Sequence, residues 1–279
     1  MLNIYLVLSV ETSMKADAFV VMVRFLRSHG QLKQVMIKQV QELPKLAEEW
    51  VLTLEERYAL FTECAKHLMD DGDSTFAFRL YFEAAMLVDV VKGTAKSDKH
   101  VTTATGLITS AIKSPAIMNF QEVLQLTIVQ ELKTKSVAMF NLLQLYTQGE
   151  MSSFKKGFEA EKKNFEAQGI TADEALLKRQ YMQICELKEG QQLSYDELAK
   201  MIGVAVDDIE EWIVEASIHG IMTAKIDQFG RQLTIKSTML CEVKKEQLLA
   251  IKDKVSAWKD RFQRIHSILV HQPELEKTD

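Results

Sequence analysis

The sequence predicts a mostly α-helical fold, in which a right-handed array of helical repeats is followed by a winged-helix subdomain and a long C-terminal helix. The 279 residues include only 11 Gly and 3 Pro, too few for the many turns of a β-sandwich or barrel. Apolar residues recur at helical spacing over most of the chain, and alternating segments that predict a hairpin come only near its end. The predicted domains are residues 1–189 for the repeats, 190–240 for the winged helix and 243–272 for the terminal helix.

Helix-start and helix-stop residues divide the repeat region into successive amphipathic helices. Gly30 follows the first run, where a left-handed residue can end a helix. Pro44 must kink or restart the second run, because proline has no backbone N–H to donate. Thr53 and Glu56 have the spacing of a capping box, in which each side chain binds a free amide of the first turn. The other predicted helices cover residues 15–29, 53–69, 74–92, 97–113, 120–126, 136–147, 151–167 and 171–188.

Helices of about 12–20 residues joined by short polar links are typical of stacked helix pairs. Thr171 and Glu174 form a second capping box before the last of these helices. No repeat consensus is evident, so we expect a degenerate solenoid, with a single irregular helical bundle as the alternative. Residues 1–10 are strongly apolar, as in a helix whose packing partner precedes it. On this interpretation the chain is truncated at its N-terminus and is the C-terminal part of something longer, with a divergent chain as the alternative.

The order of elements after residue 190 is typical of a winged helix. Ser194 and Glu197 form a third capping box on a short helix that Gly203 ends, and another helix follows over residues 206–219. Two short alternating segments then flank a turn that contains Gly230, which predicts a hairpin. Its predicted strands are residues 223–227 and 232–236.

The last predicted helix has an apolar seam that is narrow and regular. Its spacing of 3, 4, 3, 4, 3, 4 is that of a heptad repeat, and the rest of the helix is polar. Such a stripe needs a helical partner, either a groove on this chain or a helix of another chain, since leaving it in water costs several kcal/mol, roughly the transfer cost of a few apolar side chains. The seam residues are Leu248, Ile251, Val255, Trp258, Phe262, Ile265 and Leu269.

The sequence carries no recognisable catalytic, metal-binding or nucleotide-binding motif, so we predict a protein that is not an enzyme and uses no cofactor. Its glycines occur singly, without a G-x-G-x-x-G or G-K-[ST] pattern, and its histidines are scattered. Cys64, Cys185 and Cys241 lack the spacing of zinc ligands and predict reduced, buried thiols of a cytoplasmic protein. No apolar stretch approaches the roughly 20 residues that span a bilayer.

The charge distribution argues against DNA binding by the predicted winged helix. Residues 201–224 contain no Lys or Arg, whereas a helix that enters the major groove needs cations to hold phosphates. The hairpin does carry Lys225, Arg231 and Lys236, so a weak RNA or ribosomal contact and a simply solvated edge both remain open. An edge strand can also pair with a neighbouring strand. The carboxylates on the second helix are Asp207, Asp208, Glu210, Glu211 and Glu215.

Helical repeats that end in a winged helix and a long helix resemble the PCI domain family, whose members are subunits of the proteasome lid, the signalosome and eukaryotic translation initiation factor 3. Within it, the chain is similar to the subunit-m group of the initiation factor. The resemblance is carried by residues 207–216, 224–228 and 256–259, with weaker support from 49–53 and 140–146.

The resemblance implies a non-catalytic scaffold subunit in the cytoplasm. Its implied partners are other PCI subunits, MPN-domain subunits and, through the complex, the small ribosomal subunit, with a role in preinitiation complex assembly and mRNA recruitment. A lid or signalosome subunit is the alternative. No membrane contact and no sequence-specific DNA contact are expected. We expect the seam to join a helical bundle and the hairpin to pair laterally, through Lys225, Ile226, Arg231, Leu233 and Ile235.

Overall fold

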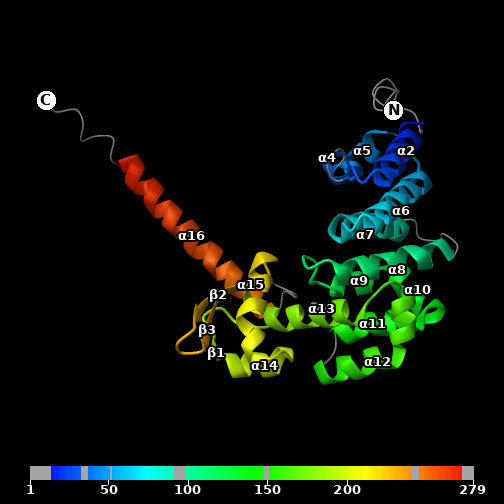
Figure 1. Ribbon diagram of the computed structural model, residues 1–279. Helices are drawn as coiled ribbons and strands as arrows, with labels where there is room; N and C mark the ends of the chain where they lie inside the picture. The colour runs from blue at the N-terminus through cyan, green and yellow to red at the C-terminus, as the bar shows by residue number, and fades with distance from the viewer. Residues whose placement is uncertain are drawn as a thin grey trace. The chain divides into compact units, whose positions relative to one another are not determined.

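The structure is a computed structural model that describes residues 14–32, 37–50, 52–90, 98–147, 151–239 and 245–271. The chain divides into two compact units, Met1–Cys241 and Glu242–Asp279. The first unit holds a stack of helices and a small three-stranded sheet, and the second holds one long helix (Figure 1). The predicted fold class, a helical array with a winged helix and a long terminal helix, is confirmed. The apolar residues 1–10 lie outside the described part of the chain.

The first helices begin and end where the sequence predicts. Helix α2 (Met14–Ser28) is followed by Gly30 with φ +65°, and α4 (Ile37–Gln41) is followed by α5 (Leu43–Glu49). Pro44 stands in the first turn of α5, so it restarts the chain as a new helix, because its missing N–H has no intrahelical role there. The ring of Phe19 packs on Trp50 with centroids 5.7 Å apart, which joins α2 to the end of α5.

Three longer helices follow as antiparallel neighbours. Helix α6 (Leu54–Asp70) opens with the predicted capping box, in which the Glu56 amide donates to Thr53 Oγ1 at 3.3 Å and the Thr53 amide donates to Glu56 Oε2 at 2.9 Å. Helices α7 (Ser74–Val90) and α8 (Asp98–Lys113) come next, and Gly93, the predicted stop of α7, lies outside the described residues.

The second half of the stack contains a helix that the sequence analysis missed. Helices α9 (Gln121–Gln125), α11 (Val137–Thr147), α12 (Met151–Ala167) and α13 (Ala172–Cys185) match predicted segments. Helix α10 (Thr127–Lys135) fills the gap between two of the predicted segments, where the sequence analysis predicts no helix. Its first amide, on Thr127, donates to a carboxylate oxygen of Asp89 at 3.0 Å. Because this cap comes from the distant helix α7, no local capping residue marks the start of α10.

The core of the stack runs continuously from helix to helix, and most helices pack on their sequence neighbours (Figure 1). In the second half of the stack the core contains a row of aromatic rings whose successive centroids are 4.9–6.1 Å apart. The rings are those of Phe120, Tyr146, Phe154, Phe158 and Phe165. The Lys178 side chain of α13 is almost fully buried and donates to the backbone carbonyls of Ser114 and Ile117, just past the end of α8. A cation is favoured there because the last carbonyls of a helix lack partners.

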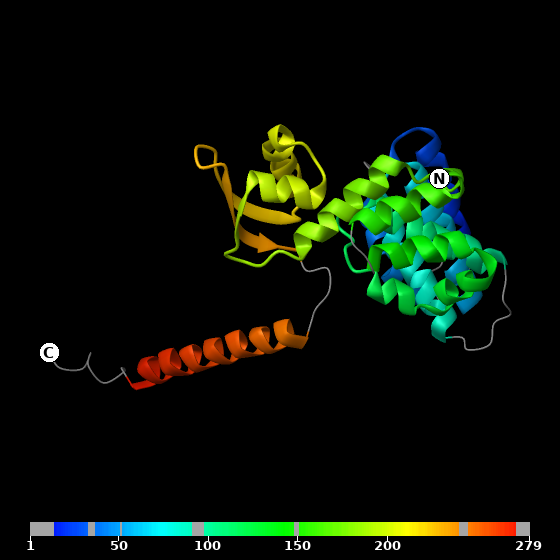
Figure 2. The same ribbon diagram turned by 90° about the horizontal axis from the view of Figure 1, so that it is seen from below.

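The winged helix follows α13 and is built on a sheet with strand order β1-β3-β2, in which both pairs are antiparallel (Figure 2). Helix α14 opens with the predicted capping box and ends at Gly203 with φ +76°. The strand β1 was not predicted, because it has three residues and its partner, β3, lies about 40 residues away in sequence. The elements are β1 (Gln192–Ser194), α14 (Tyr195–Ile202), a 3₁₀ turn (Val206–Asp208), α15 (Ile209–Ile218), β2 (Met222–Asp227) and β3 (Gln232–Thr238).

The predicted buried thiols are confirmed at two positions. Cys64 and Cys185 are both buried, and burial raises the pKa of Cys64 to about 12, so this thiol stays protonated and unreactive. Cys241 lies outside the described residues. None of the helices in the described part of the chain is both long and apolar enough to cross a membrane.

Candidate interaction surfaces

The seam predicted for the C-terminal helix lies on one continuous helix, α16 (Lys245–His271), and is exposed. The exposed fractions of its described side chains run from 45% for Ile251 to 70% for Phe262, with Trp258 at 59%. The other two are Val255 at 54% and Ile265 at 52%. The side chains of Leu248 and Leu269 lie outside the described part of the helix. Single exposed apolar residues are common on protein surfaces, but an aligned row of this length is typical of an interaction site.

The second predicted contact is the hairpin. Its first strand, β2, lies at an edge of the sheet, and its second strand, β3, lies in the centre. Because the strand order is β1-β3-β2, strand β3 is hydrogen-bonded on both sides, and of the two hairpin strands β2 is the one at an edge of the sheet, where lateral pairing is possible. Lys225 of β2 and Arg231 of the turn are exposed, as expected for contact residues. The hairpin therefore remains a candidate surface through β2 and the turn.

The structure corrects the prediction for two of the hairpin residues. Leu233 and Ile235 are fully buried, because alternate side chains of β3 point into the core beneath the helices. They cannot touch a partner while the subdomain is folded. Ile226 is half-buried and packs against the same core, so it is available only in part.

The tip of the hairpin displays an aromatic ring that the sequence analysis did not select. Phe229 is fully exposed, and the turn is held by a hydrogen bond from the Gly230 amide to Asp227 Oδ1 at 3.0 Å. Arg231 closes the turn with φ +47°, a left-handed conformation that is uncommon for a residue with a side chain. The sequence does give one indication of Phe229, because this residue stands in the middle of a predicted turn, where its side chain has no core to pack against.

Helix α15 occupies the place of a recognition helix, and its outer face is acidic and apolar. Four of the carboxylates on or beside it are exposed, those of Asp207, Asp208, Glu211 and Glu215. The fifth, Glu210, is partly buried and forms hydrogen bonds within the subdomain. Glu210 accepts hydrogen bonds from the Tyr195 hydroxyl at 3.0 Å and from Gln228 Nε2 at 2.8 Å, which ties α15 to α14 and to the hairpin turn. Val214 and Ile218 are 51% and 77% exposed on the outer face. Such a face repels phosphates and suits protein contact.

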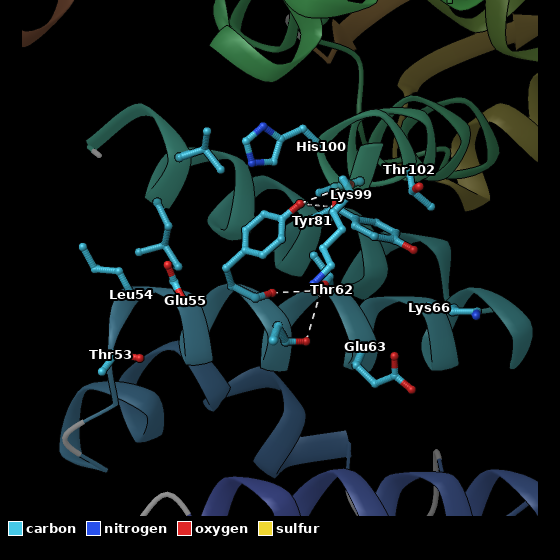
Figure 3. A pocket seen from close by; sticks show the side chains of 15 residues that line it. Thr53, Leu54, Glu55, Thr62, Glu63, Lys66, Tyr81, Lys99, His100 and Thr102 are labelled. Atoms are coloured by element: carbon cyan, nitrogen blue, oxygen red, sulfur yellow. Dashed lines mark hydrogen bonds between the residues drawn. The ribbon is translucent and has the colours of Figure 1, made fainter. Parts of the chain in front are cut away.

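A groove of about 1020 Å³ lies among α6, α7 and α8 (Figure 3). Its main polar contact joins the Tyr58 hydroxyl to Thr103 Oγ1 at 2.6 Å and to the Lys99 carbonyl at 3.2 Å. At its wall, His100 Nδ1 lies 3.8 Å from Glu131 Oε2. These groups link neighbouring helices to one another and are not arranged around a common point as the groups of an active site are.

The described residues contain no group of three or more His, Cys, Asp or Glu side chains that could hold a metal ion. The surfaces that stand out in the described regions are therefore the α16 seam, the β2 edge with its turn, and the outer face of α15.

A helical array that ends in a winged helix is consistent with a PCI module, a class of protein-interaction domain. Residues 162–237, from the end of α12 through the winged helix, match the model of the PCI domain. The sequence-based expectation of a PCI domain is thereby confirmed over these residues.

The chain is also similar to proteins named "Eukaryotic translation initiation factor 3 subunit M". It is 23% identical to the protein of Nematostella vectensis over 76% of this chain and 55% of that protein. It is 21% identical to the protein of Mus musculus over 85% of this chain and 62% of that protein, and 20% identical to the protein of Aspergillus fumigatus over 82% and 50%. The chain thus spans about half to three-fifths of the length of these curated relatives.

Proposed function

We propose that the chain is a non-catalytic scaffold subunit of the cytoplasmic eukaryotic translation initiation factor 3 complex. In this role it joins other PCI subunits and MPN-domain subunits, and through the complex it contributes to binding of the small ribosomal subunit, preinitiation complex assembly and mRNA recruitment. The observation that carries the proposal is the exposed seam of α16 in a chain whose winged helix matches the PCI domain. The similarity to subunit M proteins supports the initiation factor over the other assemblies that use PCI subunits.

The charge of α15 supports a scaffold role over nucleic-acid binding. Four exposed carboxylates and no Lys or Arg lie along or next to the helix that would enter a groove, so approach to a phosphate backbone is repulsive. The same helix buries Trp212 against Tyr181 of α13, with ring centroids 5.5 Å apart. Helix α15 is therefore anchored to the array by its inner face and presents a surface suited to proteins on its outer face.

Affinity capture of the tagged chain from eukaryotic cells tests the proposal. The expected result is co-purification of initiation factor 3 subunits, identified by mass spectrometry, and sedimentation with the small ribosomal subunit. Recovery of proteasome-lid or signalosome subunits in their place would assign the chain to those assemblies. Recovery of no PCI or MPN subunit, with no sedimentation with ribosomes, would refute the proposal.

The hairpin gives a second prediction. Lys225→Glu together with Arg231→Glu is expected to weaken co-purification of neighbouring subunits about threefold to tenfold, because the reversed charges lie on the edge strand and turn that we place in the lateral contact. Lys200→Glu, on the exposed face of α14 in the same subdomain, is the matched control and should leave co-purification unchanged. Equal recovery of the neighbouring subunits with the two variants, measured by quantitative mass spectrometry, would show that the hairpin is not part of the interface.

A further inference from the structure

The charges beside the α16 seam follow the heptad repeat. With Leu248 at position a, the seam alternates between a and d along the helix. The e positions, on one side of the seam, are Lys245, Lys252, Lys259 and His266. The g positions, on the other side, are Gln247, Lys254, Arg261 and Ile268. Neither side therefore carries an acidic residue.

The acidic residues of α16 lie on the opposite face. Asp253 and Asp260 both fall at position f, as far from the seam as a helix permits. Lys252, Lys254, Lys259 and Arg261 are exposed and border the most exposed part of the seam. Segregation of this kind gives the seam a positive border, although the whole chain has a formal net charge of -5.

From this arrangement we infer that α16 selects a helix of another subunit whose own seam is bordered by Glu or Asp, and that it rejects a second copy of itself. The inference rests on the proposed bundle role. In a parallel pair of two α16 helices, g residues face e residues, and in an antiparallel pair e faces e and g faces g. The parallel arrangement sets Lys254 of one copy against Lys259 of the other, and neither arrangement offers a carboxylate to any of these cations, which opposes self-pairing. A partner with carboxylates at e and g converts the same contacts into attractive pairs.

The full chain can be tested against two designed probe peptides, each about four heptads long, with identical apolar a and d residues. One probe carries Glu at every e and g position and the other carries Lys, so each repels its own copies at neutral pH. By fluorescence anisotropy at low salt, the Glu probe should bind at least about tenfold more tightly than the Lys probe, and added salt should reduce this ratio. Equal binding, binding of neither probe, or dimerisation of the chain in analytical ultracentrifugation would overturn the inference.

A matched pair of variants locates the effect on the helix. Arg261→Glu at position g should weaken binding of the Glu probe about fivefold, since it replaces an attractive contact with a repulsive one. Arg264→Glu makes the same change at position c, three residues away and off the border, and should change binding less than about twofold. Equal effects of the two would refute the border role.

Affinity capture separates this inference from the proposed function. If the unaltered chain co-purifies with initiation factor subunits while Arg261→Glu and Arg264→Glu behave alike, the charge inference fails and the proposed function stands. If the probes are discriminated but no such subunit co-purifies, the proposed function fails and the charge preference of α16 stands.

Discussion

Replacement of Trp258 and Phe262 by Asp is expected to release the chain from its assembly while the helical array stays folded. The two side chains are 59% and 70% exposed and lie at adjacent positions of the seam. Burial of each against a partner helix contributes about 1.5–3 kcal/mol, and an unpaired carboxylate in the same place adds a further penalty. Together these effects correspond to a loss of at least about a hundredfold in affinity. Affinity capture with quantitative mass spectrometry measures this loss as a lower recovery of the partner subunits.

The control for this double variant introduces the same charges away from the seam. Ser256→Asp with Gln263→Asp places two carboxylates at position b of the same heptads, and co-purification should then remain close to that of the unaltered chain. Thermal unfolding supplies the second control. A fall in the melting temperature that is specific to the Trp258 and Phe262 variant would mean that the seam packs on this chain's own helices, contrary to the proposed bundle role.

Elements that are signalled locally could be predicted from the sequence, whereas elements held by distant partners could not. The capping boxes at Thr53, Thr171 and Ser194 act within one turn, and the structure has all three. Helix α10 begins at an amide that is capped by Asp89, 38 residues earlier, so no residue close in sequence indicates where this helix starts. Strand β1 is likewise defined only by its pairing with β3.

The same distinction applies to the candidate surfaces. The α16 seam could be found from spacing alone, because a helix and its stripe are both local properties. The hairpin could be found too, but alternation does not reveal which face of a strand points to the core, or which strand is central. The sequence therefore predicts Leu233 and Ile235 as contact residues although they fill the interior, and it does not single out the fully exposed Phe229.

The second large effect is expected in the core of the helical array. Phe154 is fully buried in α12, with its ring centroid 4.9 Å from that of Tyr146 and 6.1 Å from that of Phe158. Phe154→Ala removes the middle ring of this aromatic chain and leaves a cavity between α11 and α12, because the neighbouring helices can collapse only in part. The free energy of unfolding should fall by about 3–5 kcal/mol, and the melting temperature by roughly 10 °C.

Phe229→Ala is the matched control, since it removes the same side chain from a fully exposed turn, and it should change the free energy of unfolding by less than about 0.5 kcal/mol. Urea titration followed by circular dichroism distinguishes the two variants. Below its melting temperature the Phe154 variant should still co-purify with its partners, because α16 is unaltered. We expect the Phe154 variant to lose stability but not assembly, and the Trp258 and Phe262 variant to lose assembly but not stability. This pair of results would assign folding to the array and association to the terminal helix. Loss of assembly in the folded Phe154 variant would instead place a partner contact on the array.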